Sequence, residues 1–273
     1  MHAELLQFST SLLDREDNPS DTQPACSAED AQSFFNEVYS SQQHTFTQPQ
    51  WIPAAPDPKQ PFQCEEIQRK EVERAIRKAR AGSSPSPIDQ VPYRVLKECP
   101  ATVTPLLHIF NLCWSAGKTP QQWKQAVIKF IPKTTAKDNP EDLSCFQPIA
   151  LTSCVGKIYS SVLKQRLMLF MTGNGYIDTT TQKAFIEGVP GCTEHQFKLW
   201  QAILDAHRHQ KNITVCWLDL ANAFGSVHHN QISYALWHYH LPAHFIRAIQ
   251  SLYTGLSAVG DKPDPSGQRA VPR

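Results

Sequence analysis

The sequence predicts a mixed α/β fold of the α+β kind, in which helices outnumber strands. Apolar residues three and four positions apart recur along most of the chain and indicate amphipathic helices. Only the short apolar runs 126–131 and 213–218 have the length and composition of strands. With 273 residues, of which 41% are hydrophobic, the chain can bury a substantial core in one or two domains.

The first 61 residues are polar and rich in proline and glutamine, which predicts a linker or N-terminal extension that is partly disordered. One helix is expected there, with Ser27 as its cap residue. The prolines between residues 48 and 61 exclude regular structure. The segment 65–80 then predicts a highly charged helix. We interpret its lysine, arginine and glutamate side chains as a solvated face with pairs at i,i+4.

Capping residues mark two of the later helices. Thr104 followed by Pro105 has the order of an N-cap and a first helical residue, and that helix should end at Gly117. Thr193, with Gln196 three positions later, has the pattern of a capping box. Periodicity predicts the remaining helices over residues 158–167, 229–240 and 242–253.

Charge and cysteine content narrow the class of protein. A net charge of +1 indicates no particular partner, so a nucleic-acid surface would need a local cluster of basic residues. The eight cysteines include no Cys-x-x-Cys pair, which argues against a zinc knuckle and a disulfide framework. We expect reduced thiols in an intracellular protein, cytoplasmic or nuclear, that is not secreted. No apolar run approaches the roughly 18 residues that a membrane span needs.

The candidate chemistry centres on Asp219, which directly follows the apolar run 213–218. A carboxylate that leaves a strand end, where carbonyl groups converge, is well placed to hold a divalent cation, and Mg²⁺ prefers oxygen ligands. The alternative reading of this spacing is an aspartate that caps the next turn. The histidine-rich stretch 228–244 is a weaker candidate for zinc, because two histidines two positions apart on a helix point to different sides.

The phrase WLDLANAFGSVHH, from Trp217 to His229, resembles the first catalytic motif of reverse transcriptases from LINE-type, non-LTR retrotransposons. Its upstream neighbours follow the order of that family and cover residues 62–256: SSPSPIDQVPY (83–93), Trp123 with VIKFIPK (127–133), FQPIALTSCVGKIYSSVLKQRL (146–167) and QKAFIEGVPGCTEHQFKL (182–199). The resemblance implies a polymerase fold of the right-hand type. Residues 62–257 would form its fingers and part of its palm, and residues 258–273 a disordered tail.

The resemblance also implies roles at the catalytic centre. Asp219 would be a catalytic carboxylate that binds Mg²⁺, helped by the carbonyl group of Leu220. Phe224 would be the steric gate that excludes a ribose 2′-hydroxyl and so selects deoxynucleotides. The implied partners are an RNA template, a DNA primer and deoxynucleotides, and the implied activity is RNA-directed DNA synthesis.

In the fingers, the resemblance makes Lys133 a contact to the nucleotide triphosphate. Gln147 stands where the family has an arginine that contacts the same group, and glutamine cannot supply the charge. The stretch that holds Gln182, Phe185 and Gly188 would lie along the template.

Polymerases of this type clamp two metals between carboxylates from separate strands. The family supplies the others from a Tyr-x-Asp-Asp hairpin, a motif that these 273 residues do not contain. We therefore expect a truncated reverse transcriptase domain that is inactive as it stands. The alternative is a non-catalytic remnant that binds nucleic acid or a protein. Without neighbouring strands, the run before Asp219 should leave the chain prone to aggregate and open to proteolysis after about Thr214. The oligomeric state is left open.

Overall fold

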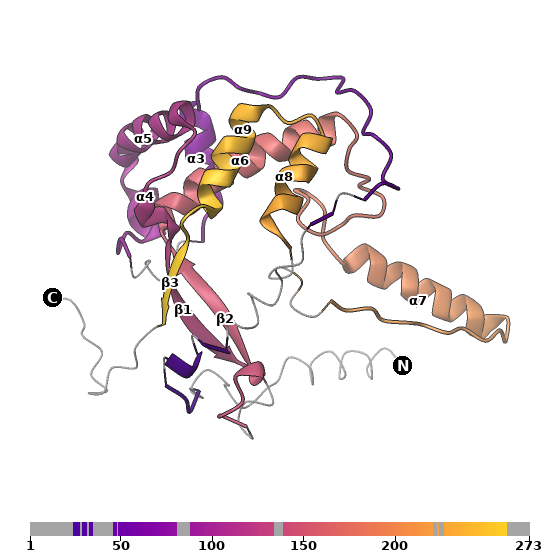
Figure 1. Cartoon of the computed structure of the whole chain (residues 1–273). Helices are drawn as coiled ribbons and strands as arrows, with labels where there is room; N and C mark the ends of the chain where they lie inside the picture. Colours follow the sequence, from indigo (N-terminus) through magenta and orange to yellow (C-terminus); the bar gives the residue numbers. More distant parts are fainter. Residues whose placement is uncertain are drawn as a thin grey trace.

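The computed structural model combines a layer of helices, a small sheet at one end of that layer, and one long helix that projects away from both (Figure 1). This arrangement confirms the α+β prediction. The structure describes residues 24–27, 29–31, 33–34, 46–47, 49–80, 88–133, 139–220, 223 and 227–260.

Seven helices and three strands have their bounds within the described residues from 49 onward. The helices are α3 (Arg69–Lys78), α4 (Tyr93–Glu98), α5 (Val103–Ala116), α6 (Cys154–Gly173), α7 (Thr193–Arg208), α8 (His229–His238) and α9 (Ala243–Tyr253). Short 3₁₀ turns lie at η2 (Pro100–Thr102), η3 (Gln121–Lys124) and η5 (Leu143–Cys145). The strands are β1 (Gln125–Pro132), β2 (Phe146–Thr152) and β3 (Ser257–Gly260). None of the helices within the described ranges is long and apolar enough to cross a membrane.

Local capping decides where several helices begin and end. Ser27 is a cap residue as predicted, because its Oγ accepts a hydrogen bond from the Asp30 N–H at 3.0 Å and Asp30 Oδ2 accepts one from the Ser27 N–H at 3.3 Å. Gly117 ends α5 with a φ of 60°, in the left-handed region that glycine tolerates. Ser153 caps the start of α6, because its Oγ accepts a hydrogen bond from the Gly156 N–H.

Two predicted caps are wrong. Thr104 lies inside α5, because the 3₁₀ turn Pro100–Thr102 leads directly into a helix that already begins at Val103. Thr193 is the first residue of α7 and not its cap, and its hydroxyl donates to the carbonyl oxygen of Pro190 at 3.2 Å. At α5 the preceding turn replaces the expected side-chain cap, because the Val103 N–H donates to the carbonyl group of Pro100.

The sheet has the order β2-β1-β3. β1, which was predicted, pairs antiparallel with β2 and parallel with β3. β2 escaped prediction because Gln147 and Pro148 interrupt its apolar residues. β3 begins at Ser257, where we expected the chain to leave the fold, so residues 258–260 belong to the sheet and not to an irregular tail.

The strand predicted over residues 213–218 is not formed. The segment is irregular, and the side chains of Trp217 and Leu218 are 79% and 95% exposed. A run that is apolar on both faces needs strands beside it, and the described part of the chain pairs none with it.

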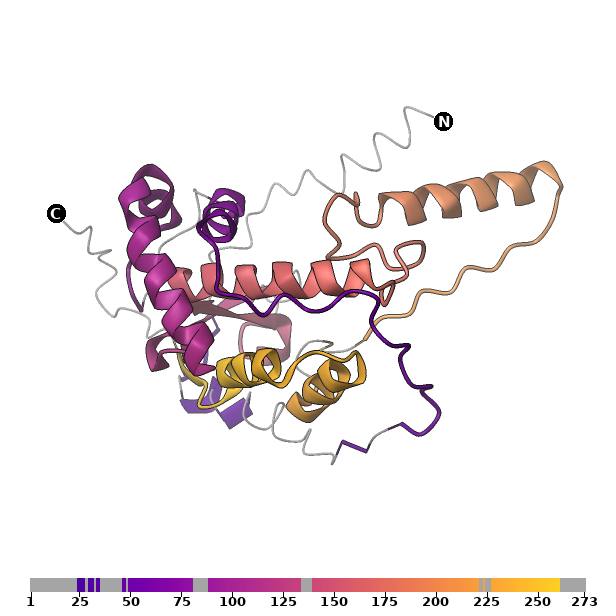
Figure 2. The same cartoon turned by 90° about the horizontal axis from the view of Figure 1, so that it is seen from above.

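The core lies among the helices. Figure 2 shows α6 in the middle of the layer, with α3 on one side and α8 and α9 on the other. The side chains of Phe110, Tyr159 and Phe245, from α5, α6 and α9, have no exposed surface. Because α9 contributes to this core and β3 to the sheet, the end of the described chain is built into the same fold as its first helices.

A buried arginine ties the segment before α3 to this core. Arg166, on α6, donates one hydrogen bond to each carboxylate oxygen of Glu71, at 2.8 and 2.9 Å. Its remaining hydrogens reach the backbone carbonyl groups of Gln63, Glu65 and Glu66. The guanidinium is therefore fully paired, which a buried charge requires.

Candidate functional site

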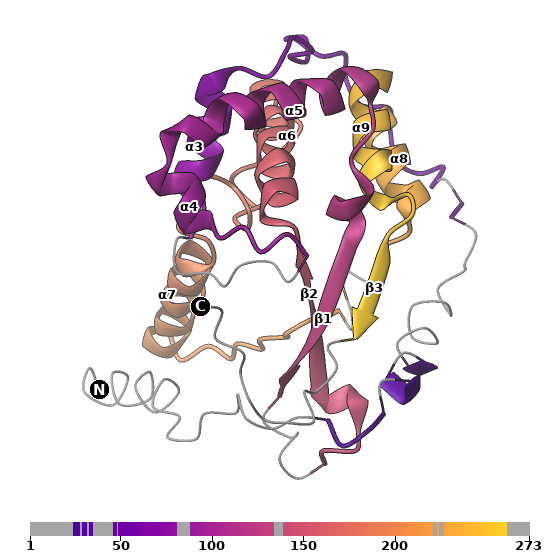
Figure 3. The same cartoon turned by 90° about the vertical axis from the view of Figure 1, so that its left-hand side faces the viewer.

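Lys133 and Gln147 lie on one face of the sheet, at neighbouring ends of β1 and β2. Gln147 stands opposite Ile131 in the register, and the Lys133 N–H donates to the carbonyl group of Cys145 at 2.9 Å, which extends the pairing beyond β1. Directly opposed residues share a face and alternate residues return to it, so Lys133 and Gln147 are diagonal neighbours. Lys129 lies on the same face, and all three side chains are exposed. Figure 3 shows β1 and β2 extending away from the helices.

The loop between β1 and β2 holds the lysine at the end of the sheet. Lys133 Nζ donates to the carbonyl group of Ser144 at 2.8 Å. Hydrogen bonds from the side chain and backbone of Ser144 hold the pKa of the Asp142 carboxyl below its usual range, and the charge of Lys133 contributes. At this end of the sheet, a hydrogen bond to the backbone therefore holds the Lys133 ammonium group, and the Asp142 carboxylate lies near it. Gln147 adds hydrogen-bonding capacity but no charge.

Asp219 and Leu220, the predicted metal ligands, are not part of a formed metal site. Both are exposed in the irregular segment that follows α7, and Asp219 Oδ1 accepts a hydrogen bond from the Leu220 N–H at 3.0 Å. Within the described ranges, no group of three or more histidine, cysteine, aspartate or glutamate side chains is placed to hold a metal ion. One exposed carboxylate does not fit the needs of two Mg²⁺ ions. Phe224, the predicted steric gate, lies outside the described residues.

The predicted template residues lie in the loop between α6 and α7. Gln182 is exposed, and its Nε2 donates to the carbonyl group of Ala184 at 3.1 Å. Phe185 is 72% exposed and has a φ of 63°, and Gly188 has a φ of 78°. The loop thus presents an aromatic ring to solvent from a left-handed backbone.

This loop lies beside basic side chains that the sequence did not single out. Lys164 Nζ, on α6, lies 6.0 Å from the centroid of the Phe185 ring. Lys78, on α3, forms an ion pair with Glu187 of the loop at 2.5 Å. The sequence predicts Lys78 as part of a solvated helix face. Lys164 lies in a segment whose helix is predicted from its apolar residues alone. Contacts between residues 109 apart in sequence left no local signal.

The structure brings Lys133 and Gln147 together but joins neither to Asp219. Among the described residues, Asp219 is hydrogen-bonded to its neighbour Leu220, and no hydrogen bond or ion pair links it to Lys133 or Gln147. Asp219 lies in the irregular segment after α7, which runs back from the far end of that helix toward the body in Figure 1.

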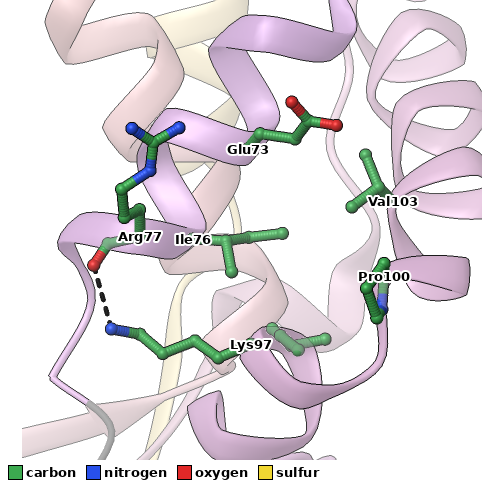
Figure 4. Close-up of a pocket in the computed structure, with 7 residues that line it drawn as sticks. Glu73, Ile76, Arg77, Lys97, Pro100 and Val103 are labelled. Carbon is green, nitrogen blue, oxygen red and sulfur yellow. Dashed lines mark hydrogen bonds between the residues drawn. The ribbon is translucent and has the colours of Figure 1, made fainter.

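A cavity of about 410 Å³ lies between α3, α4 and the start of α5, and none of the predicted site residues lines it. In Figure 4, Ile76 and Val103 form its apolar wall, and Lys97 donates to the carbonyl group of Arg77 at its edge. Its lining residues are Glu73, Ile76, Arg77, Leu96, Lys97, Pro100 and Val103. None of these belongs to the motif residues, so the cavity is not part of the candidate site.

The amino-acid sequence is similar to that of proteins from one group of retrotransposable elements. No protein-family model matches the sequence. The retrovirus-related Pol polyprotein from type-2 retrotransposable element R2DM of Drosophila melanogaster is 28% identical over 173 residues, which is 63% of this chain and 15% of that protein. The corresponding Pol polyprotein from type-1 retrotransposable element R2 of Nasonia vitripennis is 28% identical over 193 residues, 71% of this chain and 17% of that protein. The chain therefore spans less than a fifth of the length of these relatives, and it is similar to part of the Pol polyproteins of R2 retrotransposable elements.

Proposed function

We propose that residues 62–260 are the fingers and the first part of the palm of a reverse transcriptase of the right-hand type, and that the exposed face of β1 and β2 binds phosphate groups. The observation that carries this proposal is the placement of Lys129, Lys133 and Gln147 on one sheet face. The relationship to retrotransposon Pol polyproteins supports a nucleic-acid partner, and the implied substrates are deoxynucleotides on an RNA template.

The side chains on this face attract phosphate groups through charge and do not impose a fixed contact geometry. Two ammonium groups attract phosphate oxygens as point charges, whereas an arginine at position 147 would have added a bidentate contact. Binding through this face should therefore be weak, independent of base sequence and sensitive to salt.

Asp219 and the carbonyl group of Leu220 are the part of a Mg²⁺ site that this chain would supply. Mg²⁺ would neutralise charge on the triphosphate and on the attacking oxygen when fully coordinated. Asp219 is exposed and belongs to no group of three or more potential metal ligands among the described residues, which favours the second candidate function, a non-catalytic nucleic-acid-binding segment, for the chain by itself.

The first prediction concerns binding. We expect the chain to bind a fluorescein-labelled oligo-uridine at about 50 mM salt and to lose most of that affinity at about 200 mM salt. The double variant Lys129→Gln/Lys133→Gln should lower the salt slope by about 1.4, because each phosphate contact on a single strand contributes about 0.7. Fluorescence anisotropy across a salt series measures both.

The matched control is Lys59→Gln/Lys118→Gln, which removes the same charge from two exposed lysines outside the sheet. This control should leave the salt slope almost unchanged. If the control lowers the slope as much as the sheet variant does, binding follows net charge and the proposed face is not the site.

The second prediction concerns activity. We expect no template-dependent primer extension by the 273-residue chain with either Mg²⁺ or Mn²⁺, because one carboxylate cannot hold two metals in place. The assay uses a labelled DNA primer on an RNA template with all four deoxynucleotides, and Asp219→Ala is run beside it. Extension products that disappear in Asp219→Ala would show that the chain completes its own catalytic centre.

A further inference from the structure

The loop between α6 and α7 exposes an aromatic ring from a strained backbone. Phe185 has a φ of 63°, a conformation that is strained for a residue with a Cβ, and yet its side chain is 72% exposed. Burial of the ring therefore does not explain the conformation. Strain of this kind is concentrated at ligand-binding sites.

Three cations surround the same loop. Lys164 lies 6.0 Å from the centroid of the Phe185 ring, and Lys78 is paired with Glu187. Arg74 is one helical turn before Lys78 and so lies on the same face of α3. A hydrogen bond from Lys78, together with the charges of Lys78, Arg74 and Lys164, holds the pKa of Glu187 below its usual range. Three cations are thus close enough to act on one carboxylate, which can neutralise only one of them.

An exposed ring beside several cations is the arrangement with which proteins bind single-stranded nucleic acid. Successive bases stack on aromatic rings whatever their sequence, while basic side chains follow the phosphates. A duplex hides its base faces, so the ring is useful only to an unpaired strand.

We propose that this loop, together with α3 and α6, is a binding site for single-stranded nucleic acid in which Glu187 competes with the strand. Phe185 stacks on a base, Arg74, Lys78 and Lys164 contact phosphates, and the Glu187 carboxylate occupies a phosphate position until a strand displaces it. The proposal rests on the proposed function, because it assigns the regulation of the expected template surface. To the expected template surface, the proposal adds phosphate contacts from Arg74, Lys78 and Lys164, and Glu187 as a competitor within the chain.

The ion pair between Lys78 and Glu187 is weak enough for a bound strand to displace the Glu187 carboxylate. The side chains of Lys78 and Glu187 are 46% and 76% exposed, so their pair is screened by water and salt. Gly188 follows Glu187 with a φ of 78° and a position where an added Cβ would meet nothing within 4 Å. The carboxylate therefore sits on an open loop, held on one side by an exposed ion pair.

The test measures binding of a labelled oligo-uridine, and of a duplex of the same length, to the full chain. Glu187→Gln is expected to raise the affinity for the single strand about two- to fivefold at about 50 mM salt, the range that an exposed ion pair allows. Phe185→Leu should weaken single-strand binding about fivefold or more and leave duplex binding unchanged. Lys164→Gln should weaken binding to both probes.

The matched control for the competitor is Glu98→Gln, which removes the same charge from an exposed pair with Arg94 on α4. An equal gain in Glu187→Gln and Glu98→Gln would overturn the competitor, since the effect would then be one of net charge. Unchanged single-strand binding in both Phe185→Leu and Lys164→Gln would overturn the site. If the chain binds no oligo-uridine at all, the proposed function fails first. If it binds and only the sheet lysines matter, this inference alone fails.

Discussion

Replacing Arg166 with methionine is expected to lower the free energy of unfolding by about 3–5 kcal/mol, the range for breaking a buried ion pair on one side. The guanidinium has no exposed side-chain surface, and Glu71 is only 9% exposed. Methionine fills most of the volume but leaves the Glu71 carboxylate buried without its partner. It also leaves the carbonyl groups of Gln63, Glu65 and Glu66 without their donor.

Urea unfolding followed by circular dichroism measures this loss. The control is Arg94→Met on α4, where the arginine and its partner Glu98 are 72% and 64% exposed, and a change within about 0.5 kcal/mol is expected. A loss below about 1 kcal/mol for Arg166→Met would mean that the pair does not hold the segment before α3.

A double variant separates the charge from the lost carbonyl contacts. Arg166→Met/Glu71→Leu removes both charges, so it should recover part of the stability that Arg166→Met loses. The recovery should be incomplete, because the three carbonyl groups still lack a donor. A double variant that is no more stable than Arg166→Met would show that the unpaired carboxylate is not the main cause.

The same pair sets a pH dependence. Burial alone would raise the pKa of Glu71, but hydrogen bonds from Arg166 and the Gln68 backbone, with the charges of Arg166 and Lys70, lower it below its usual value near 4.5. A carboxyl whose pKa is lowered by folding stabilises the fold above its unfolded pKa. That contribution is lost as the pH falls from about 4.5 through the folded pKa. Glu71→Gln should therefore flatten the acid limb of the stability curve.

The helices could be predicted because their signals are local. The apolar spacing of α6 and α9 and the glycine that ends α5 depend on neighbours within a few residues. The burial of Arg166 left no such signal, because its carboxylate partner lies 95 residues away in sequence. From the sequence alone, a charged residue within an apolar helix is interpreted as exposed to solvent, because its partners become apparent only in the folded structure.

The strands and the site depended on pairing, and pairing is where the prediction failed. β2 and β3 are strands because β1 lies between them, and neither has a run of apolar residues long enough to predict it. The run 213–218 has such a composition but no neighbour among the described residues. Lys133 and Gln147 were proposed from the resemblance, and only the register of β1 and β2 shows that they share a face.

The segment that holds Asp219 is also where the chain should be cut first, yet the cut should not separate the two ends. Chymotrypsin is expected to cleave at Trp217 or Leu218, which are 79% and 95% exposed in a stretch with neither helix nor strand. From the sequence alone, everything after about Thr214 was expected to be lost. In the structure, however, Phe245 on α9 has no exposed surface.

Several contacts hold the C-terminal fragment in place after such a cut. The Thr119 N–H donates to Ser251 Oγ at 2.9 Å, and β3 pairs with β1 over residues 257–260. A further cut at the exposed Phe185 would not break these contacts, because both elements lie outside the stretch between the two cuts. We therefore expect the fragments before Phe185 and after Leu218 to elute together in native gel filtration and to separate in denaturant. Trp237, which is 55% exposed but lies within α8, is the internal control and should be cleaved later, because proteases need an unfolded stretch of backbone. A C-terminal fragment that elutes alone under native conditions would show that α9 and β3 do not stabilise the fold as these contacts require.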